Sequence, residues 1–174
     1  GTPIAENAMT GVALGAALCG LRPIHVHLRN DFLLVAMDQI ANYVAKWQDM
    51  FDHQVKVPLV IRSIIGRGWG CGAQHSQSLH GLFAQIPGLK VVMPSTPYDA
   101  KGLFLAAVAD DSPVLFLEHR WLYKNTGSVP QEMYTLPIGK CAPMRTGSSL
   151  TIVATSLAAI HALKACEEHD LDVD

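Results

Sequence analysis

The stretch Val57–Gln85, VPLVIRSIIGRGWGCGAQHSQSLHGLFAQ, indicates the architecture of the chain. It opens with an apolar run rich in β-branched residues (57–61), which is typical of a buried strand. A glycine-rich loop (63–78) follows, and then a short helix-forming run (79–85) that stops before Pro87 and Gly88. A strand, a loop and a helix in this order predict a β–α unit, in which the next strand runs parallel to the first.

The same alternation continues on both sides of this unit. Further helices are expected at 4–21, 32–51, 97–109 and 157–169, and further strands at 24–28, 90–93, 114–118 and 149–154. Asp31 is expected to cap the long helix at 32–51. Short apolar strands, each followed by a helix, predict an α/β fold with an open, mostly parallel sheet and helices on both faces. The irregular stretch 120–143 predicts a boundary between a domain at 1–143 and the start of another at 144–174.

The composition limits the class of protein. The 174 residues suffice for one α/β domain, and 49% are hydrophobic but only 16% charged. We therefore expect either a sheet buried on both faces or a large surface buried against partner subunits. The formal net charge of -2 offers no basic field, so we expect neither nucleic acid nor a membrane as partner. No apolar run reaches the roughly 20 residues that a bilayer-spanning helix needs.

The cysteines and the chain ends give weaker indications. Cys19, Cys71, Cys141 and Cys166 are widely spaced, and three of them lie in apolar or glycine-rich runs. This pattern predicts reduced, buried thiols in a reducing compartment. No signal peptide is visible, and we interpret the chain as a piece of a longer polypeptide. The expected location is cytoplasmic, or the mitochondrial matrix if the source is eukaryotic.

Ligands of open parallel sheets bind beyond the carboxyl ends of the strands. Three predicted loops lie there, at 29–32, 62–77 and 118–120. In the second loop glycines alternate with larger residues, which allows close approach of the backbone to a ligand but does not match a Walker loop. His75 in this loop could titrate near neutrality and move protons, or it could be a solvated surface residue.

Glu6 is the one charged residue in the predicted helix 4–21. An acid in the first turn is stabilised by the helix dipole, by roughly 0.3–1 kcal/mol. The alternative is a carboxyl group facing an apolar pocket, where it would hold or share a proton. His25 and His27 share a strand face and could bind a metal, but no nearby cysteine or carboxylate completes a set. The chain contains no GxSxG elbow of a serine hydrolase.

Several segments keep the order and spacing of one known family from about Thr2 to about Gly139. They are TPIAENAMTGVALGAALCGLRPI (2–24), NDF (30–32) with DQIAN (38–42), GAQHSQS (72–78) and PGLKVVMPSTPYDAKGLFLAAVADDSPVLFLEH (87–119). Together they resemble the β subunit of the thiamin-diphosphate-dependent 2-oxo acid dehydrogenase E1 component, in its transketolase-like pyrimidine-binding domain. The resemblance implies the thiamin-diphosphate-binding fold.

The resemblance also implies roles for individual residues. The Glu6 carboxyl would hydrogen-bond N1′ of the cofactor's aminopyrimidine ring and so activate the thiazolium carbon that attacks a 2-oxo acid. Phe32 and Leu28 would line the pyrimidine pocket, and His75 would contact the substrate and the intermediates. A structural potassium site, built mainly from backbone carbonyls, is implied at Leu59, Ala107, Val108, Asp110 and Ser112.

The implied partners are an E1 α-type subunit, which would hold the diphosphate and its Mg²⁺, a second β copy and a lipoyl acyltransferase. The implied function is oxidative decarboxylation of a 2-oxo acid with acyl transfer to lipoyl. The sequence does not distinguish pyruvate, branched-chain 2-oxo acids and acetoin. We expect the isolated chain neither to bind thiamin diphosphate tightly nor to turn over.

Two alternatives remain open at this point. One is another thiamin-diphosphate enzyme of the transketolase-like kind. The other is a degenerate module for assembly, without catalysis. The second alternative rests on Val26, Leu28 and Arg29, which depart from the family pattern beside the pyrimidine pocket.

Overall fold

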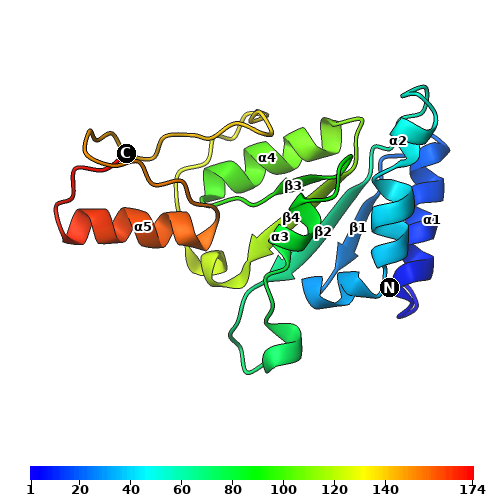
Figure 1. Cartoon of the computed structure of the whole chain (residues 1–174), viewed down its shortest axis with the longest axis horizontal. Helices are drawn as coiled ribbons and strands as arrows, with labels where there is room; N and C mark the ends of the chain where they lie inside the picture. Colours follow the sequence, from blue (N-terminus) through cyan, green and yellow to red (C-terminus); the bar gives the residue numbers. More distant parts are fainter.

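A computed structural model describes all residues from 1 to 174. Its centre is a four-stranded sheet with the order β1-β2-β4-β3 (Figure 1). The strands are β1 (Ile24–His27), β2 (Val60–Ile65), β3 (Lys90–Val92) and β4 (Val114–His119). Every neighbouring pair is parallel. The predicted α/β class with a parallel sheet is therefore confirmed.

Helices and shorter turns connect the strands. The α-helices are α1 (Glu6–Leu18), α2 (Trp47–Met50), α3 (His80–Ala84), α4 (Pro97–Ala109) and α5 (Leu157–Glu168). The remaining helical turns are η1 (Asn30–Leu34), η2 (Gln39–Val44), η3 (Ala73–His75) and η4 (Arg120–Lys124). α4 has the predicted bounds because its start is strongly capped: the Asp99 N–H donates to the Thr96 hydroxyl, and the Thr96 N–H donates to the Asp99 carboxylate.

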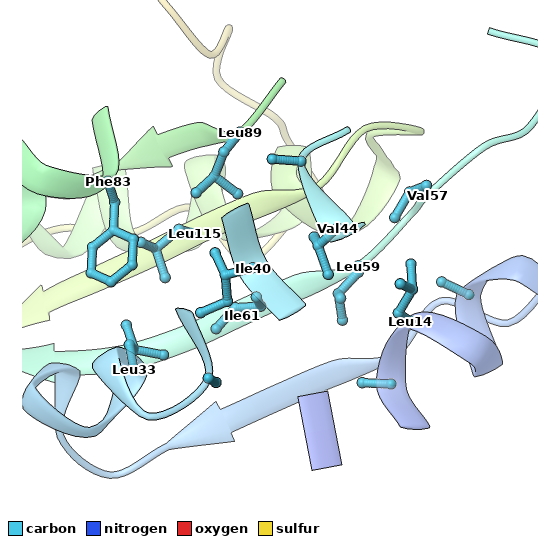
Figure 2. Close-up of a cluster of buried hydrophobic side chains, with 14 of the residues drawn as sticks. Leu14, Leu33, Ile40, Val44, Val57, Leu59, Ile61, Phe83, Leu89 and Leu115 are labelled. Carbon is cyan, nitrogen blue, oxygen red and sulfur yellow. The ribbon is translucent and has the colours of Figure 1, made fainter. Parts of the chain in front are cut away.

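The sheet is buried on both faces where β2 and β4 form its centre. Alternate side chains point to opposite faces, so Ile61 and Leu115 join one cluster whereas Val60 and Phe116 join the other. The larger cluster packs the sheet against α1, η2 and α3, as Figure 2 shows for Leu14, Leu33, Ile40, Val44, Leu59, Phe83 and Leu89. The smaller cluster includes Ala107 and so covers the other face with α4.

The predicted helix at 32–51 is wrong as a single element. The chain forms the 3₁₀ turn η1, the π-helical η2 and the short α2 instead. Leu33, Ala36, Ile40 and Val44 are all fully buried against the sheet, so the expected apolar face of a helix is present. The backbone that carries it is divided into 3₁₀, π and α turns, however, and does not form one regular helix. Asp31 caps no helix here, because its carboxylate accepts a hydrogen bond from a distant loop.

The predicted strand at 149–154 is also wrong. Only a single bridge, between Leu150 and Val173, forms there. A strand requires a neighbour along its length, and the four-stranded sheet contains no residue of this segment. β2 begins at Val60 rather than at residue 57, since Pro58 in the predicted start has no N–H to donate. The division at residue 143 stays a prediction.

The cysteines differ from the expectation of buried thiols. All four are free, and Cys166 is buried, but Cys19 and Cys141 are exposed and Cys71 is partly exposed. An apolar local sequence does not determine which side of an element faces solvent, so the prediction failed for these positions. None of the helices is both long and apolar enough to cross a membrane.

Candidate functional site

The three loops that the sequence places beyond the sheet do gather at one edge. Figure 1 shows η1, the loop after β2 and η4 at the carboxyl end of the strands, and the first turn of α1 lies at the same end. We call this side the ligand edge, defined by Glu6, Phe32, His75 and Arg120. The opposite side, where the strands begin, is the far edge.

Phe32 and His75 meet at the ligand edge although 43 positions separate them in the sequence. Their ring centroids are 5.1 Å apart, with an edge-to-face angle of 75° between the planes. Phe32 lies in η1, and His75 ends η3, which starts after Gly72 with a φ of 68°. A positive φ of this kind favours glycine, so the loop sequence permits the turn that places His75. Such edge-to-face packing is a favoured aromatic geometry.

Asn30 and Asp31 fix the segment that follows His75. Both side chains are buried, and both bind the backbone of the segment 77–79. The Asn30 amide donates to the Gln77 carbonyl at 2.9 Å and accepts from the Leu79 N–H at 2.9 Å. The Asp31 carboxylate accepts from the Gln77 N–H at 3.1 Å. Sequence reasoning missed this role, although the NDF motif contained both residues.

Arg120 also holds this loop in place, as Asn30 and Asp31 do, and we call such side chains polar clamps. Its side chain is fully buried, and its guanidinium donates to the carbonyls of Gly68, at 2.9 Å, and His75, at 2.7 Å. One arginine thereby joins both halves of the glycine-rich loop to the end of β4. The loop at 118–120 was expected at this edge, but nothing in the sequence alone distinguished Arg120 from an exposed arginine.

Glu6 begins α1 and is only partly exposed. The hydroxyl of Thr10 donates to the Glu6 carbonyl at 2.7 Å and lies 3.4 Å from Nε2 of His27. These contacts connect the first turn of α1 to the last residue of β1. No group of the chain donates a hydrogen bond to the Glu6 carboxylate, so it can pair with a ligand. The position is compatible with the helix-dipole interpretation as well.

His25 and His27 lie side by side, with ring centroids 4.3 Å apart. Burial, and to a smaller extent the neighbouring His25, lower the pKa of His27 to about 4. His27 is therefore neutral near pH 7. No group of three or more histidine, cysteine, aspartate or glutamate side chains is arranged for a metal ion. Leu28, next in the chain, is 76% exposed.

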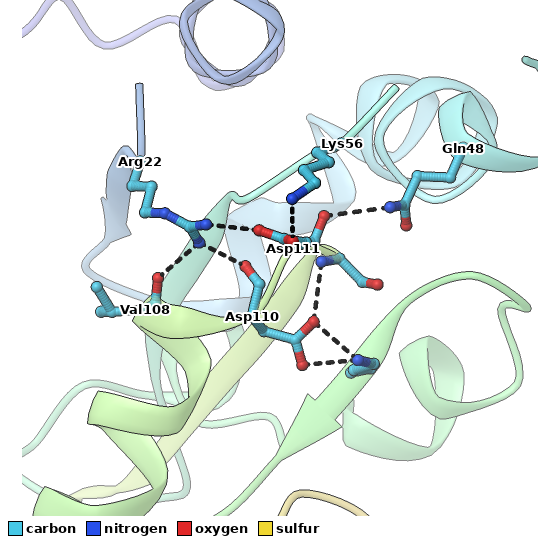
Figure 3. A network of polar contacts seen from close by, with 8 residues as sticks. Arg22, Gln48, Lys56, Val108, Asp110 and Asp111 are labelled. Carbon is cyan, nitrogen blue, oxygen red and sulfur yellow. Dashed lines mark hydrogen bonds and ion pairs between the residues drawn. The ribbon is translucent and has the colours of Figure 1, made fainter. Parts of the chain in front are cut away.

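The residues of the implied potassium site lie at the far edge, where Figure 3 shows their surroundings. Arg22 donates to the carbonyls of Val108, at 3.1 Å, and Asp110, at 2.9 Å. The Leu59 carbonyl accepts from the Val114 N–H at 2.9 Å. Potassium would have to share the carbonyl oxygens of Val108 and Asp110 with the guanidinium of Arg22, so these two oxygens are not free to coordinate the ion. The potassium site stays a prediction from the resemblance.

The buried parallel sheet and its polar clamps define an α/β domain whose ligand edge is built from the loops after β1, β2 and β4. Within this class the chain belongs to a specific family, the pyrimidine-binding domain of transketolase, which matches residues 1–126.

Known relatives agree with this assignment. The chain is 48% identical over 164 residues to the β subunit of acetoin:2,6-dichlorophenolindophenol oxidoreductase from Cupriavidus necator, covering 94% of this chain and 48% of that protein. It is 45% identical over 172 residues to the β subunit of 2-oxoisovalerate dehydrogenase from Bacillus subtilis, covering 98% and 53%. The chain thus spans about half the length of the curated relatives it matches.

A solved structure shows the same fold. A split-gene transketolase, described as an inactive β4 tetramer, superimposes with a TM-score of 0.74 over 98% of this chain and 53% of that one. The sequence identity is 22%, so this likeness concerns the fold alone.

Proposed function

We propose that the chain is the β-subunit-type part of a thiamin-diphosphate-dependent 2-oxo acid dehydrogenase E1, and that Glu6 is the residue that activates the cofactor. The relatives named above are β subunits of an acetoin oxidoreductase and of a 2-oxoisovalerate dehydrogenase, at 48% and 45% identity. The contact between Phe32 and His75 at the ligand edge, where α1 also begins, is the observation that favours a working site over a degenerate module.

The residues present fit the aminopyrimidine half of thiamin diphosphate. A carboxyl group without a donor from its own chain can pair with a ring nitrogen, and the partly exposed ring of Phe32 and the exposed side chain of Leu28 offer apolar contact to a flat ring. When bound, the cofactor supplies the electron sink for decarboxylation. Glu6 would hold the proton shared with the pyrimidine, and the imidazole of His75 would face the reacting carbon and orient the substrate.

The other half of the cofactor requires a partner. The chain has no cluster of carboxylates for Mg²⁺, and we propose that an α-type subunit holds the diphosphate and the metal. A second β copy would complete a heterotetramer, and a lipoyl acyltransferase would accept the acyl group. The substrate would be pyruvate, a branched-chain 2-oxo acid or acetoin, and the residues of the ligand edge do not select among them.

The test is Glu6→Gln in the enzyme assembled with its α-type partner. We expect 2-oxo acid-dependent dye reduction to fall by about 10²–10⁴-fold, the usual contribution of a positioned acid or base. Because the amide keeps the size of the side chain, assembly measured by gel filtration should be unchanged.

Glu167→Gln is the matched control, since Glu167 lies exposed in α5, outside the ligand edge. It should retain full activity. A Glu6→Gln enzyme that assembles and works at the wild-type rate would refute the role of Glu6. A wild-type assembly that is inactive with all three substrate classes would instead favour the non-catalytic module.

The isolated chain provides a second test. We expect isothermal titration to show binding of thiamin diphosphate weaker than micromolar, because the diphosphate and its metal lack their ligands here. Affinity at or below about 1 μM for the chain without a partner would contradict this division of the site.

A further inference from the structure

The glycine-rich loop holds a thiol between two arginines. Nη2 of Arg29 donates to Sγ of Cys71 at 3.5 Å, and the guanidinium of Arg120 is a second positive charge beside the same sulfur. Both guanidinium groups also face the ring of Trp69, at 5.8 Å and 4.9 Å from its centroid. Cys71 is thus an acidic group whose neighbours are positive and aromatic.

Arg120 lacks the partner that a buried cation normally has. Its side chain is 1% exposed, and none of the ion pairs in the structure includes it. Two of its nitrogens bind backbone carbonyls, while Nε has no hydrogen-bond partner. Buried charges are usually paired. A thiolate at Cys71 would supply the missing negative charge.

The thiol is also accessible. Cys71 is partly exposed, and the flanking Gly70 and Gly72 have open space where a side chain would otherwise begin. A small reagent can therefore approach the sulfur without displacing other groups. The other thiols differ: Cys19 and Cys141 are exposed without an arginine contact, and Cys166 is buried.

We propose that Cys71 is an oxidant-sensitive modification site, at which the thiolate reacts with hydrogen peroxide to form a sulfenic acid. In this step the sulfur attacks one peroxide oxygen, an S–O bond forms and the O–O bond breaks. The sulfur loses two electrons to the peroxide, and the released hydroxide takes up a proton to become water. A second thiol restores Cys71 through a mixed disulfide.

The electrostatics of the pocket agree with this proposal. The guanidinium of Arg120, and then that of Arg29, hold the pKa of the Cys71 thiol below its ordinary value, because both positive charges stabilise the thiolate. These two arginines, from η4 and from the loop after β1, are the charged groups that face the sulfur. The third contact is the Trp69 carbonyl, at 3.7 Å.

The experiment uses the intact, fully reduced chain, with its own cysteines as references. Alkylation by iodoacetamide is followed at each cysteine by peptide mass spectrometry between pH 5.5 and 9. We expect Cys71 to reach its half-maximal rate at a lower pH than Cys19 and Cys141, and to react at least about threefold faster at pH 7. With limiting hydrogen peroxide and dimedone, Cys71 should be the first residue labelled.

Two variants of Arg29 separate charge from shape. Arg29→Gln should shift the alkylation profile of Cys71 toward that of Cys19, whereas Arg29→Lys should retain most of the difference. Arg29 is a loop residue that binds no buried backbone group, so neither change threatens the fold. Equal profiles for Cys71, Cys19 and Cys141, or dimedone labelling that spares Cys71, would overturn the proposal.

Discussion

The two edges of the sheet are stabilised by different means. At the ligand edge, Asn30, Asp31 and Arg120 are buried, and each binds the backbone of a loop. At the far edge, Arg22, Lys56 and Lys90 form half-exposed ion pairs with two aspartates. Buried side chain-to-backbone bonds fix loop positions, whereas exposed ion pairs contribute little to stability. The ligand edge is therefore the part of the molecule that is held in one geometry.

The strongest test of this contrast is Arg120→Met. The change keeps an unbranched side chain but removes two charge-assisted hydrogen bonds to carbonyls in a buried place. We expect the free energy of unfolding to fall by about 3 kcal/mol, measured by urea denaturation. Arg67→Met, in the same loop but exposed, is the control and should change it by less than about 0.5 kcal/mol. Similar losses in the two variants would remove the contrast.

Acid should weaken the ligand edge first. The pKa of His27 is lowered to about 4 by burial, and an unfolded histidine titrates near 6.5. Below pH 6.5 the unfolded state binds the proton more readily, so stability is complete above that pH and is lost as the pH falls toward 4. We expect a loss of about 2 kcal/mol between pH 7 and pH 5.

His27→Gln should flatten this pH dependence when urea midpoints are compared across the range. His169→Gln, at an exposed position after α5, should leave it unchanged. A pH profile that is the same with and without His27 would show that its imidazole is solvated in the folded protein.

The smallest effect is expected at the far edge, for Asp111→Asn. Lys56 and then Arg22 hold the pKa of Asp111 below its ordinary value, so its contribution is present above pH 4 and is lost only as the pH falls through the lowered pKa. Because the group is exposed, we expect the Tm at pH 7 to change by at most about 2 °C.

This difference should disappear in about 1 M NaCl, where exposed charges are screened within roughly 3 Å. If Asp111→Asn lowers the Tm by more than Arg120→Met does, or if its effect persists at high salt, the far edge contributes more to stability than the ligand edge.

The sequence predicted much of this arrangement because local signals were clear. Thr96 and Pro97 determine the start of α4, and the apolar runs at β2 and β4 permit little other than buried parallel strands. The rule that loops after parallel strands lie beyond the carboxyl ends of the strands placed the loops of Phe32 and His75 at one edge, although it did not predict the contact between the two rings.

The failures have physical causes as well. Residues 32–51 show a helical period and bury one side against the sheet, but their backbone is wound as 3₁₀, π and α turns in succession, which the spacing of apolar residues does not reveal. Arg120 and Asp31 have partners about 45 positions away in the sequence, and local spacing contains no information about such partners. The side chains that hold the loops of the ligand edge in place could therefore not be identified from the sequence alone.

The hydrogen bonds from Arg120 to the carbonyls of Gly68 and His75 have a consequence for protein engineering. If the loop after β2 were replaced by that of a relative to alter substrate preference, the new loop would lack its matching arginine unless the end of β4 were exchanged too. The same holds for Asn30, which anchors the downstream end of that loop. Residues 29–32, 66–79 and 118–121 thus form one exchangeable cassette, and libraries that randomise only one of them will mostly sample loops that have lost their shape.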